Sequence, residues 1–149
     1  MEFRTAQNSD ILQLTSWFNT KKEAQNWGGP LIQFPIELGQ LKKDISFDVH
    51  ASFALINNDE LLGFIQVFDK YDYKHIGRVV INPSRRGEGL GLTLMEYLFE
   101  EYKECNKSYS LYVYKDNTKA KNLYEKLGFE ICEDASTYGK NNDCFFMKK

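Results

Sequence analysis

The sequence predicts an α/β fold, in the broad sense that includes α+β, with helices packed against a mixed β-sheet. Apolar residues recur every three or four positions near the N-terminus and again in residues 90–102, which is the period of an amphipathic helix. Between and after these segments lie short apolar runs bounded by turn residues, which is the pattern of β-strands. Hydrophobic residues make up 42% and aromatic residues 15% of the chain, which suits a packed core.

The N-terminal third is predicted to hold one strand and two helices. Residues 2–6 form the strand. Three capping residues then precede an apolar helical pattern, which predicts a helix over residues 8–20. Glycine and proline in residues 27–30 interrupt this pattern, and a second, short helix is predicted over residues 36–45.

The rest of the chain is predicted to be mostly sheet, with two further helices. Strands over residues 52–56 and 61–68 are joined by the polar turn NNDE, which indicates a hairpin. The elements that follow are a strand over 76–81, a helix from Leu90, a strand over 111–114, a helix over 118–127 and strands over 129–132 and 144–147. The predicted order is therefore β-α-α-β-β-β-α-β-α-β-β, in a single domain of residues 1–149.

Composition argues against several classes of protein. The net charge of -2 gives no basic field, so no nucleic-acid partner is predicted. Cys105, Cys132 and Cys144 lack the spacing of a zinc site, so we predict no metal and reduced thiols, as in a cytoplasmic protein. The N-terminus has no signal-peptide core, and no apolar run approaches the ~18–20 residues that span a bilayer, so no membrane partner is predicted.

A glycine-rich stretch precedes the helix that starts at Leu90. Residues 85–91 read RRGEGLG and follow the apolar strand. A helix N-terminus attracts phosphate through its unpaired N–H groups, and glycines let a diphosphate approach the backbone, while Arg85 and Arg86 would add positive charge. The spacing fits neither a dinucleotide-binding GxGxxG, whose third glycine falls on Leu92, nor a Walker A loop. A helix-entry loop without a ligand is the alternative from glycines alone.

Two motifs resemble those of the GNAT acetyltransferase superfamily. Residues 86–91, preceded by the sequence VINP, resemble its (Q/R)xxGxG/A coenzyme A signature, and residues 117–129 resemble its second signature, NxxAxxLYxxxGF. The resemblance implies a GNAT fold, with a mixed, mostly antiparallel sheet flanked by about four helices. It also implies an N-acetyltransferase that moves an acetyl group from acetyl-CoA directly to a primary amine of a small molecule or protein, with a homodimer as one arrangement found in the family.

Two other functions remain open. A non-catalytic acyl-CoA-binding sensor or regulatory module would keep the glycine-rich loop without turnover. A nucleotide-binding regulatory domain is disfavoured by the glycine spacing.

The resemblance assigns a cofactor-binding set and one main catalytic residue. Arg86 opens the loop. The strand at Val79, Val80 and Ile81 pairs with the pantetheine arm of the cofactor. A backbone N–H of this strand polarises the thioester carbonyl, and such a donor typically lowers the activation free energy by about 3–4 kcal/mol. Asn117 caps the second motif's helix and contacts the cofactor. Tyr124 is the expected general acid, and ordinary packing beside Leu123 and Leu127 is the alternative. The backbone N–H groups that hold the diphosphate belong to Gly87, Glu88, Gly89, Leu90, Gly91 and Leu92.

The general base and the acceptor site are less defined by the sequence. Some family members carry a glutamate five residues before the asparagine of the second motif, where this chain has Tyr112. His75 has a suitable pKa range and is the candidate catalytic base. Alternatively, His75 is an ordinary surface or hydrogen-bonded histidine, and the amine loses its proton through ordered water. Residues 27–30 and Phe34-Pro35 resemble an acceptor segment of small bacterial-type members, or form a turn with core aromatics. Tyrosines that line a pocket or fill the core are Tyr71, Tyr73, Tyr112 and Tyr138.

Overall fold

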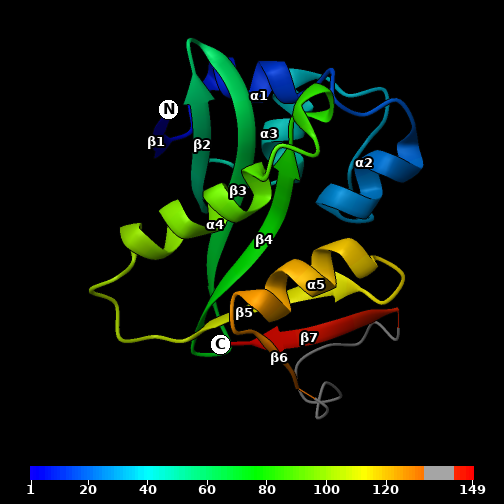
Figure 1. The fold of residues 1–149 in the computed structure, drawn as a ribbon. Helices are drawn as coiled ribbons and strands as arrows, with labels where there is room; N and C mark the ends of the chain where they lie inside the picture. Colours follow the sequence, from blue (N-terminus) through cyan, green and yellow to red (C-terminus); the bar gives the residue numbers. More distant parts are fainter. Residues whose placement is uncertain (133–142) are drawn as a thin grey trace. The chain divides into compact units, whose positions relative to one another are not determined.

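The computed structural model describes residues 1–132 and 143–149, and its strands form one mixed sheet (Figure 1). The strand order is β1-β2-β3-β4-β5-β7-β6. β4 and β5 run parallel, whereas the β1–β2, β5–β7 and β6–β7 pairs are antiparallel. The strands are β1 (Glu2–Thr5), β2 (Ala51–Asn57), β3 (Glu60–Lys70), β4 (Tyr73–Ile81), β5 (Tyr109–Tyr114), β6 (Glu130–Ile131) and β7 (Cys144–Lys148).

Five α-helices and one short 3₁₀ helix lie among the described residues, so the predicted mixed fold class is confirmed, with one more α-helix than predicted. They are α1 (Asn8–Leu14), α2 (Lys21–Gly28), α3 (Leu38–Asp44), the 3₁₀ helix η1 (Pro83–Arg85), α4 (Leu90–Glu101) and α5 (Thr118–Lys126). None of these described helices is long and apolar enough to cross a membrane.

The predicted helix over residues 8–20 is wrong in its second half, and the extra helix, α2, lies over residues 21–28, where none was predicted. α1 ends at Leu14, where the Thr15 and Ser16 hydroxyls donate to the carbonyls of Leu12 and Gln13. Side-chain hydroxyls that bond back to the preceding turn compete with helix continuation.

A new helix, α2, then begins behind the Thr20 cap. The Thr20 hydroxyl accepts from the Glu23 N–H at 3.1 Å, and the Glu23 carboxylate accepts from the Asn19 N–H at 3.0 Å. The sequence TKKE at residues 20–23 is the signature of such a reciprocal cap, and it is the signal that would have predicted α2.

Contacts divide the described chain into two compact units. The first comprises residues 1–66 and 78–101, and the second comprises residues 67–77 and 102–149, so that β3 and β4 contribute to both. The prediction of a single domain stays a prediction.

In the first unit, helices cover both faces of the sheet formed by β1–β4. Residues of α1, α2 and α3 join sheet residues such as Phe64 and Val80 in one hydrophobic core. α4 packs on the other face, where Gly63 leaves room for Leu94: a Cβ at Gly63 would lie 3.4 Å from the Leu94 side chain. The apolar face predicted for this helix is confirmed, because Leu90, Leu94 and Leu98 are all buried.

In the second unit, α5 packs with a sheet built from β5, β7, β6 and the adjoining ends of β3 and β4. Leu111, Val113, Phe146 and Met147 are buried in this sheet. α5 ends where Gly128 adopts φ of +98°, as the sequence predicts for a helix followed by glycine.

Candidate cofactor-binding site and catalytic residues

The glycine-rich loop has a backbone conformation that requires glycine at two positions. Gly87 has φ of +83° and Gly89 has φ of +75°, in the left-handed region that side chains with a Cβ rarely adopt. A Cβ built on either residue would meet no atom within 4 Å. The loop backbone is therefore open on this side, so a ligand can approach its N–H groups closely.

The loop leads into the N-terminus of α4, which is suited to an anion. The Thr93 N–H bonds to the Gly89 carbonyl at 3.2 Å, so the N–H groups of Leu90, Gly91 and Leu92 belong to the first helical turn and have no partner in the helix itself. This first turn contains no acidic residue, so no carboxylate on the turn offsets the positive end of the helix dipole. Buried Leu90 anchors the turn, and Leu92 is 41% exposed.

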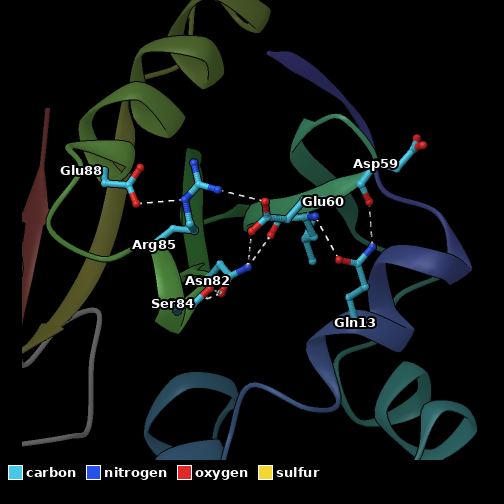
Figure 2. Close-up of polar contacts among 8 residues, drawn as sticks. Gln13, Asp59, Glu60, Asn82, Ser84, Arg85 and Glu88 are labelled. Atoms are coloured by element: carbon cyan, nitrogen blue, oxygen red, sulfur yellow. Dashed lines mark hydrogen bonds and ion pairs between the residues drawn. The ribbon is translucent and has the colours of Figure 1, made fainter.

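The two arginines before the loop differ in their surroundings. Arg86 is exposed. Arg85 instead lies between two carboxylates (Figure 2): its Nη1 is 2.9 Å from Glu60 Oε2, and its Nε is 2.9 Å from Glu88 Oε2. The bond to Glu88 is the main reason that the pKa of Arg85 is raised. Sequence reasoning placed both arginines near phosphate but could not detect the pairing with Glu60, which lies 25 residues away.

Polar side chains around Arg85 connect the hairpin turn, the end of β4 and α1 (Figure 2). The Asn82 amide donates to the Leu61 carbonyl at 3.0 Å, and its oxygen accepts from the Ser84 N–H at 3.0 Å, which caps η1. Gln13 donates to the Asp59 carbonyl at 3.3 Å and accepts from the Leu61 N–H at 3.0 Å. These bonds fix the segment from which the glycine-rich loop starts.

The predicted cofactor strand is the end of β4. The parallel register of β4 with β5 covers Lys74 to Ile76, and Val79, Val80 and Ile81 come after this paired stretch. Val80 is buried, whereas Val79 and Ile81 are partly exposed. The structure thus places these three residues and the glycine-rich loop together in the first unit.

Arg78, just before these three residues, interrupts the regular strand. Its φ of +48° is unusual for a residue with a Cβ. Its Nε donates to the Gly28 carbonyl and its Nη1 to Gln66 Oε1, both at 2.8 Å, which ties β4 to the end of α2 and to β3. Burial lowers the pKa of Arg78. No sequence pattern marked this residue.

In the second unit, the structure places Tyr124 on α5 and Asn117 at the N-cap of this helix. Tyr124 is 8% exposed, its ring packs edge-on against Phe129 with centroids 5.9 Å apart, and burial raises its pKa to about 12. The phenol is therefore neutral at physiological pH. Asn117 caps the helix as predicted, since its side-chain oxygen accepts from the Ala120 N–H at 3.2 Å.

His75 is buried in β4 within an aromatic cluster of the second unit. It is 5% exposed, and its Nδ1 lies 2.8 Å from the Ser110 hydroxyl. Tyr112, which stands at the position of the family's glutamate, packs edge-on against it with centroids 5.0 Å apart. Burial, followed by the charge of Lys70, lowers the pKa of His75 to about 4, so His75 would be a weak proton acceptor.

The other candidate residues take part mainly in packing. Trp27 stacks on Phe18 with centroids 4.8 Å apart and packs against the core of the first unit, and its indole Nε1 is buried without a partner in the described part of the chain. Tyr71 and Tyr73 both contact Phe146. Tyr138 lies outside the described residues. Among residues 1–132 and 143–149, no group of three or more His, Cys, Asp or Glu side chains could hold a metal ion.

Comparisons with known proteins agree on one family. A family model described as the acetyltransferase (GNAT) family matches residues 12–129. The curated mycothiol acetyltransferase of Mycolicibacterium smegmatis is 31% identical over 114 residues, which cover 70% of this chain and 38% of that protein. The chain spans only 38% and 53% of the lengths of the first two curated relatives that it matches.

Solved structures share the fold over nearly the whole chain. The PaiA N-acetyltransferase of Thermoplasma acidophilum, solved with coenzyme A, has a TM-score of 0.74 at 18% identity and covers 99% of this chain and 97% of its own. The ribosomal-protein-alanine N-acetyltransferase of Brucella melitensis has a TM-score of 0.70 at 19% identity and covers 100% of this chain and 99% of its own.

Proposed function

This chain belongs to the acetyltransferase (GNAT) family, and on that premise we propose that it transfers an acetyl group from acetyl-CoA directly to a primary amine of a small molecule or a protein. The observation that carries the proposal is the open, left-handed backbone at Gly87 and Gly89 ahead of α4, whose first turn lacks an acidic side chain. A helix N-terminus of this kind suits the diphosphate of coenzyme A.

The residues of the first unit would bind acetyl-CoA. The N–H groups of residues 87–92 would hold the diphosphate, and exposed Arg86 would add positive charge. The end of β4 would pair with the pantetheine arm, and the N–H of Val80 or Ile81 would polarise the thioester carbonyl, a contribution of about 3–4 kcal/mol.

Tyr124 of the second unit would protonate the leaving thiolate. In the transfer, the amine nitrogen forms a bond to the thioester carbon, the carbon–sulfur bond breaks, and the departing sulfur takes a proton from the phenol. Supporting this role, Tyr124 stands at the tyrosine position of the second motif, and its phenol keeps its proton throughout the neutral range. Burial raises its pKa to about 12, which makes it a weaker acid than a free tyrosine. Asn117 would contact the cofactor beside its capping role.

The amine must lose its own proton, and we favour water as its acceptor. The buried His75, with a pKa of about 4, is a poor acceptor for a proton from an amine near pKa 10. The role of His75 as the catalytic base stays a prediction, and the slope of log kcat/KM against pH for His75→Gln tests it. Self-association of the chain into a homodimer stays a prediction as well.

The test of the proposed function is acetyl transfer to a panel of amines. Spermidine, free amino acids and peptides with a free N-terminus or lysine are each incubated with acetyl-CoA, and thiol release and product mass are measured. We expect thiol release that depends on one class of amine, with an increase of 42 Da in that amine, the mass of an added acetyl group.

The same experiment separates the alternative function. A non-catalytic acyl-CoA-binding module would bind coenzyme A with no thiol release above background for any amine. That result would refute the transferase and retain the cofactor site.

A further inference from the structure

Arg85 is the centre of a polar cluster that the proposed reaction does not use. Its Nη1 and Nε contact two different carboxylates, those of Glu60 and Glu88, each at 2.9 Å (Figure 2). Glu60 starts β3, whereas Glu88 lies within the glycine-rich loop, between the two left-handed glycines. One guanidinium therefore connects a strand to the loop.

Glu88 creates an electrostatic problem for a phosphate-binding loop. A carboxylate beside a diphosphate opposes binding, and an unscreened pair of like charges about 4 Å apart in water weakens an affinity by about fivefold. Glu88 is 47% exposed, and its carboxylate bonds to Arg85. That ion pair offsets part of the carboxylate's charge, since the same guanidinium also pairs with Glu60, and it orients the Glu88 side chain.

The strand end of the cluster is also held by hydrogen bonds. The Asn82 amide donates to the Leu61 carbonyl at 3.0 Å and to Glu60 Oε1 at 3.4 Å. Gln13 bonds to the Leu61 N–H, next to Glu60. Arg85 is thus bonded through Glu60 to the start of β3, which Asn82 and Gln13 hold in place. Through Glu88, the same arginine restrains the glycine-rich loop.

We propose that Arg85 is a positioning residue, which offsets the charge of Glu88 and ties the glycine-rich loop to the start of β3, and that Arg86 is left as the arginine for the cofactor's phosphates. This inference rests on the proposed function of the loop as the coenzyme A site. It differs from the simpler expectation that both arginines contact phosphate directly.

The test is a double-mutant cycle of Arg85→Met, Glu88→Gln and the double variant, read by calorimetric titration with coenzyme A. Glu88→Gln alone should change Kd little, because Arg85 already offsets the Glu88 charge. In Arg85→Met, the released Glu88 carboxylate repels the diphosphate and the loop loses its tie, so we expect Kd to rise about fivefold to tenfold. In Arg85→Met/Glu88→Gln, the carboxylate is gone, and we expect most of that loss to be recovered. Arg85→Lys keeps one charge but lacks the two-pronged geometry, so its Kd should fall between wild type and Arg85→Met.

Two controls make the cycle specific. Lys43→Met removes the same charge from an exposed position on α3, so it measures the effect of net charge alone. Thermal unfolding of each variant without ligand establishes that it is folded, since these ion pairs are largely exposed and contribute little to stability.

The outcomes are distinct. A larger gain in affinity from Glu88→Gln in Arg85→Met than in wild type supports the positioning role. A double variant as weak as Arg85→Met would overturn it, because Arg85 would then act on the phosphates directly, and an unchanged Kd in Arg85→Met would overturn it too. A folded wild type with no affinity for coenzyme A would refute the proposed function itself, and with it this inference.

Discussion

Burial shifts the pKa values of Tyr124 and His75 in opposite directions because their charged forms are the anion and the cation, respectively. The pKa of Tyr124 is raised to about 12 and that of His75 is lowered to about 4. Both shifts favour the neutral form at physiological pH. Tyr124 therefore keeps its proton at neutral pH but is a weaker acid than a free tyrosine, and neutral His75 can accept or donate a hydrogen bond with Ser110.

Replacement of Tyr124 by phenylalanine tests the proton donor. We expect kcat to fall about 100-fold, as is typical when a general acid is lost, with the Kd for acetyl-CoA nearly unchanged. Steady-state kinetics and calorimetry measure the two quantities. Tyr97→Phe on α4 removes a hydroxyl from a 37%-exposed tyrosine and serves as the control. An undiminished kcat in Tyr124→Phe would rule out the assignment.

His75 makes the stability of the protein depend on pH. The unfolded side chain titrates near pH 6.5 and the folded one near 4, so between these values the unfolded state binds a proton that the folded state does not. The contribution of His75 is complete above about pH 6.5 and is lost as pH falls toward 4, by about 3 kcal/mol in all.

Urea unfolding of wild type and His75→Gln at pH 7.5 and pH 4.5 measures this effect. The variant should lose less stability than wild type on acidification, by up to about 3 kcal/mol. His50→Gln, at the other histidine of the chain, is compared in the same way. Burial also lowers the pKa of His50, so this variant too should lose less stability than wild type on acidification. Equal acid sensitivity of wild type and His75→Gln would contradict the burial argument.

At the scale of elements, β4 ends in the proposed cofactor strand, Val79 to Ile81, and is bonded through Arg78 to the helices of the first unit. Arg78 has a left-handed backbone conformation and bonds to the Gly28 and Ile45 carbonyls, at the ends of α2 and α3. Gly28 belongs to residues 27–30, which the sequence indicated for the amine acceptor, whereas α3 begins after Phe34-Pro35. The side chain of Arg78 thus stabilises residues 27–30 from β4.

Substitution of Arg78 separates the side-chain bonds from the backbone conformation. Arg78→Ala leaves the Gly28 carbonyl and Gln66 unsatisfied, which should cost about 2–3 kcal/mol of unfolding free energy. Arg78→Gly loses the same bonds but relieves the strain at φ of +48°, so it should be about 1 kcal/mol more stable than Arg78→Ala. In a regular strand, the alanine variant would instead be the more stable of the two. Urea unfolding decides, and an alanine variant at least as stable as the glycine variant would show that the backbone there is unstrained.

The elements that the sequence predicted well are those with local signals. α4 and α5 have clear apolar periods and glycine at one end, and both begin at the predicted residues, Leu90 and Thr118. α2 also has a local signal, its TKKE cap, although no helix was predicted over residues 21–28. The left-handed Arg78 and the Glu60–Arg85 pair depend on groups that only folding brings together, so no local pattern indicates them.

At the scale of the whole molecule, the family and the mixed sheet could be predicted because two motifs lie in the correct order on the correct elements. The first motif lies at the start of α4 in the first unit, and the second forms α5 in the second unit. The acceptor could not be predicted, because its recognition depends on side chains from separate segments and not on a short motif.

The most direct test of acetyl-CoA binding by the glycine-rich loop is thermal unfolding of wild type and Gly89→Trp, with and without acetyl-CoA. At 100 times Kd the ligand should add about 2.7 kcal/mol, which raises the Tm of wild type by about 5–10 °C. Gly29→Trp is the control, because Gly29 also has a left-handed φ and open space where a Cβ would lie. We expect a shift in wild type and Gly29→Trp that disappears in Gly89→Trp. No shift in folded wild type, or an equal shift in Gly89→Trp, would contradict the claim that this loop binds acetyl-CoA.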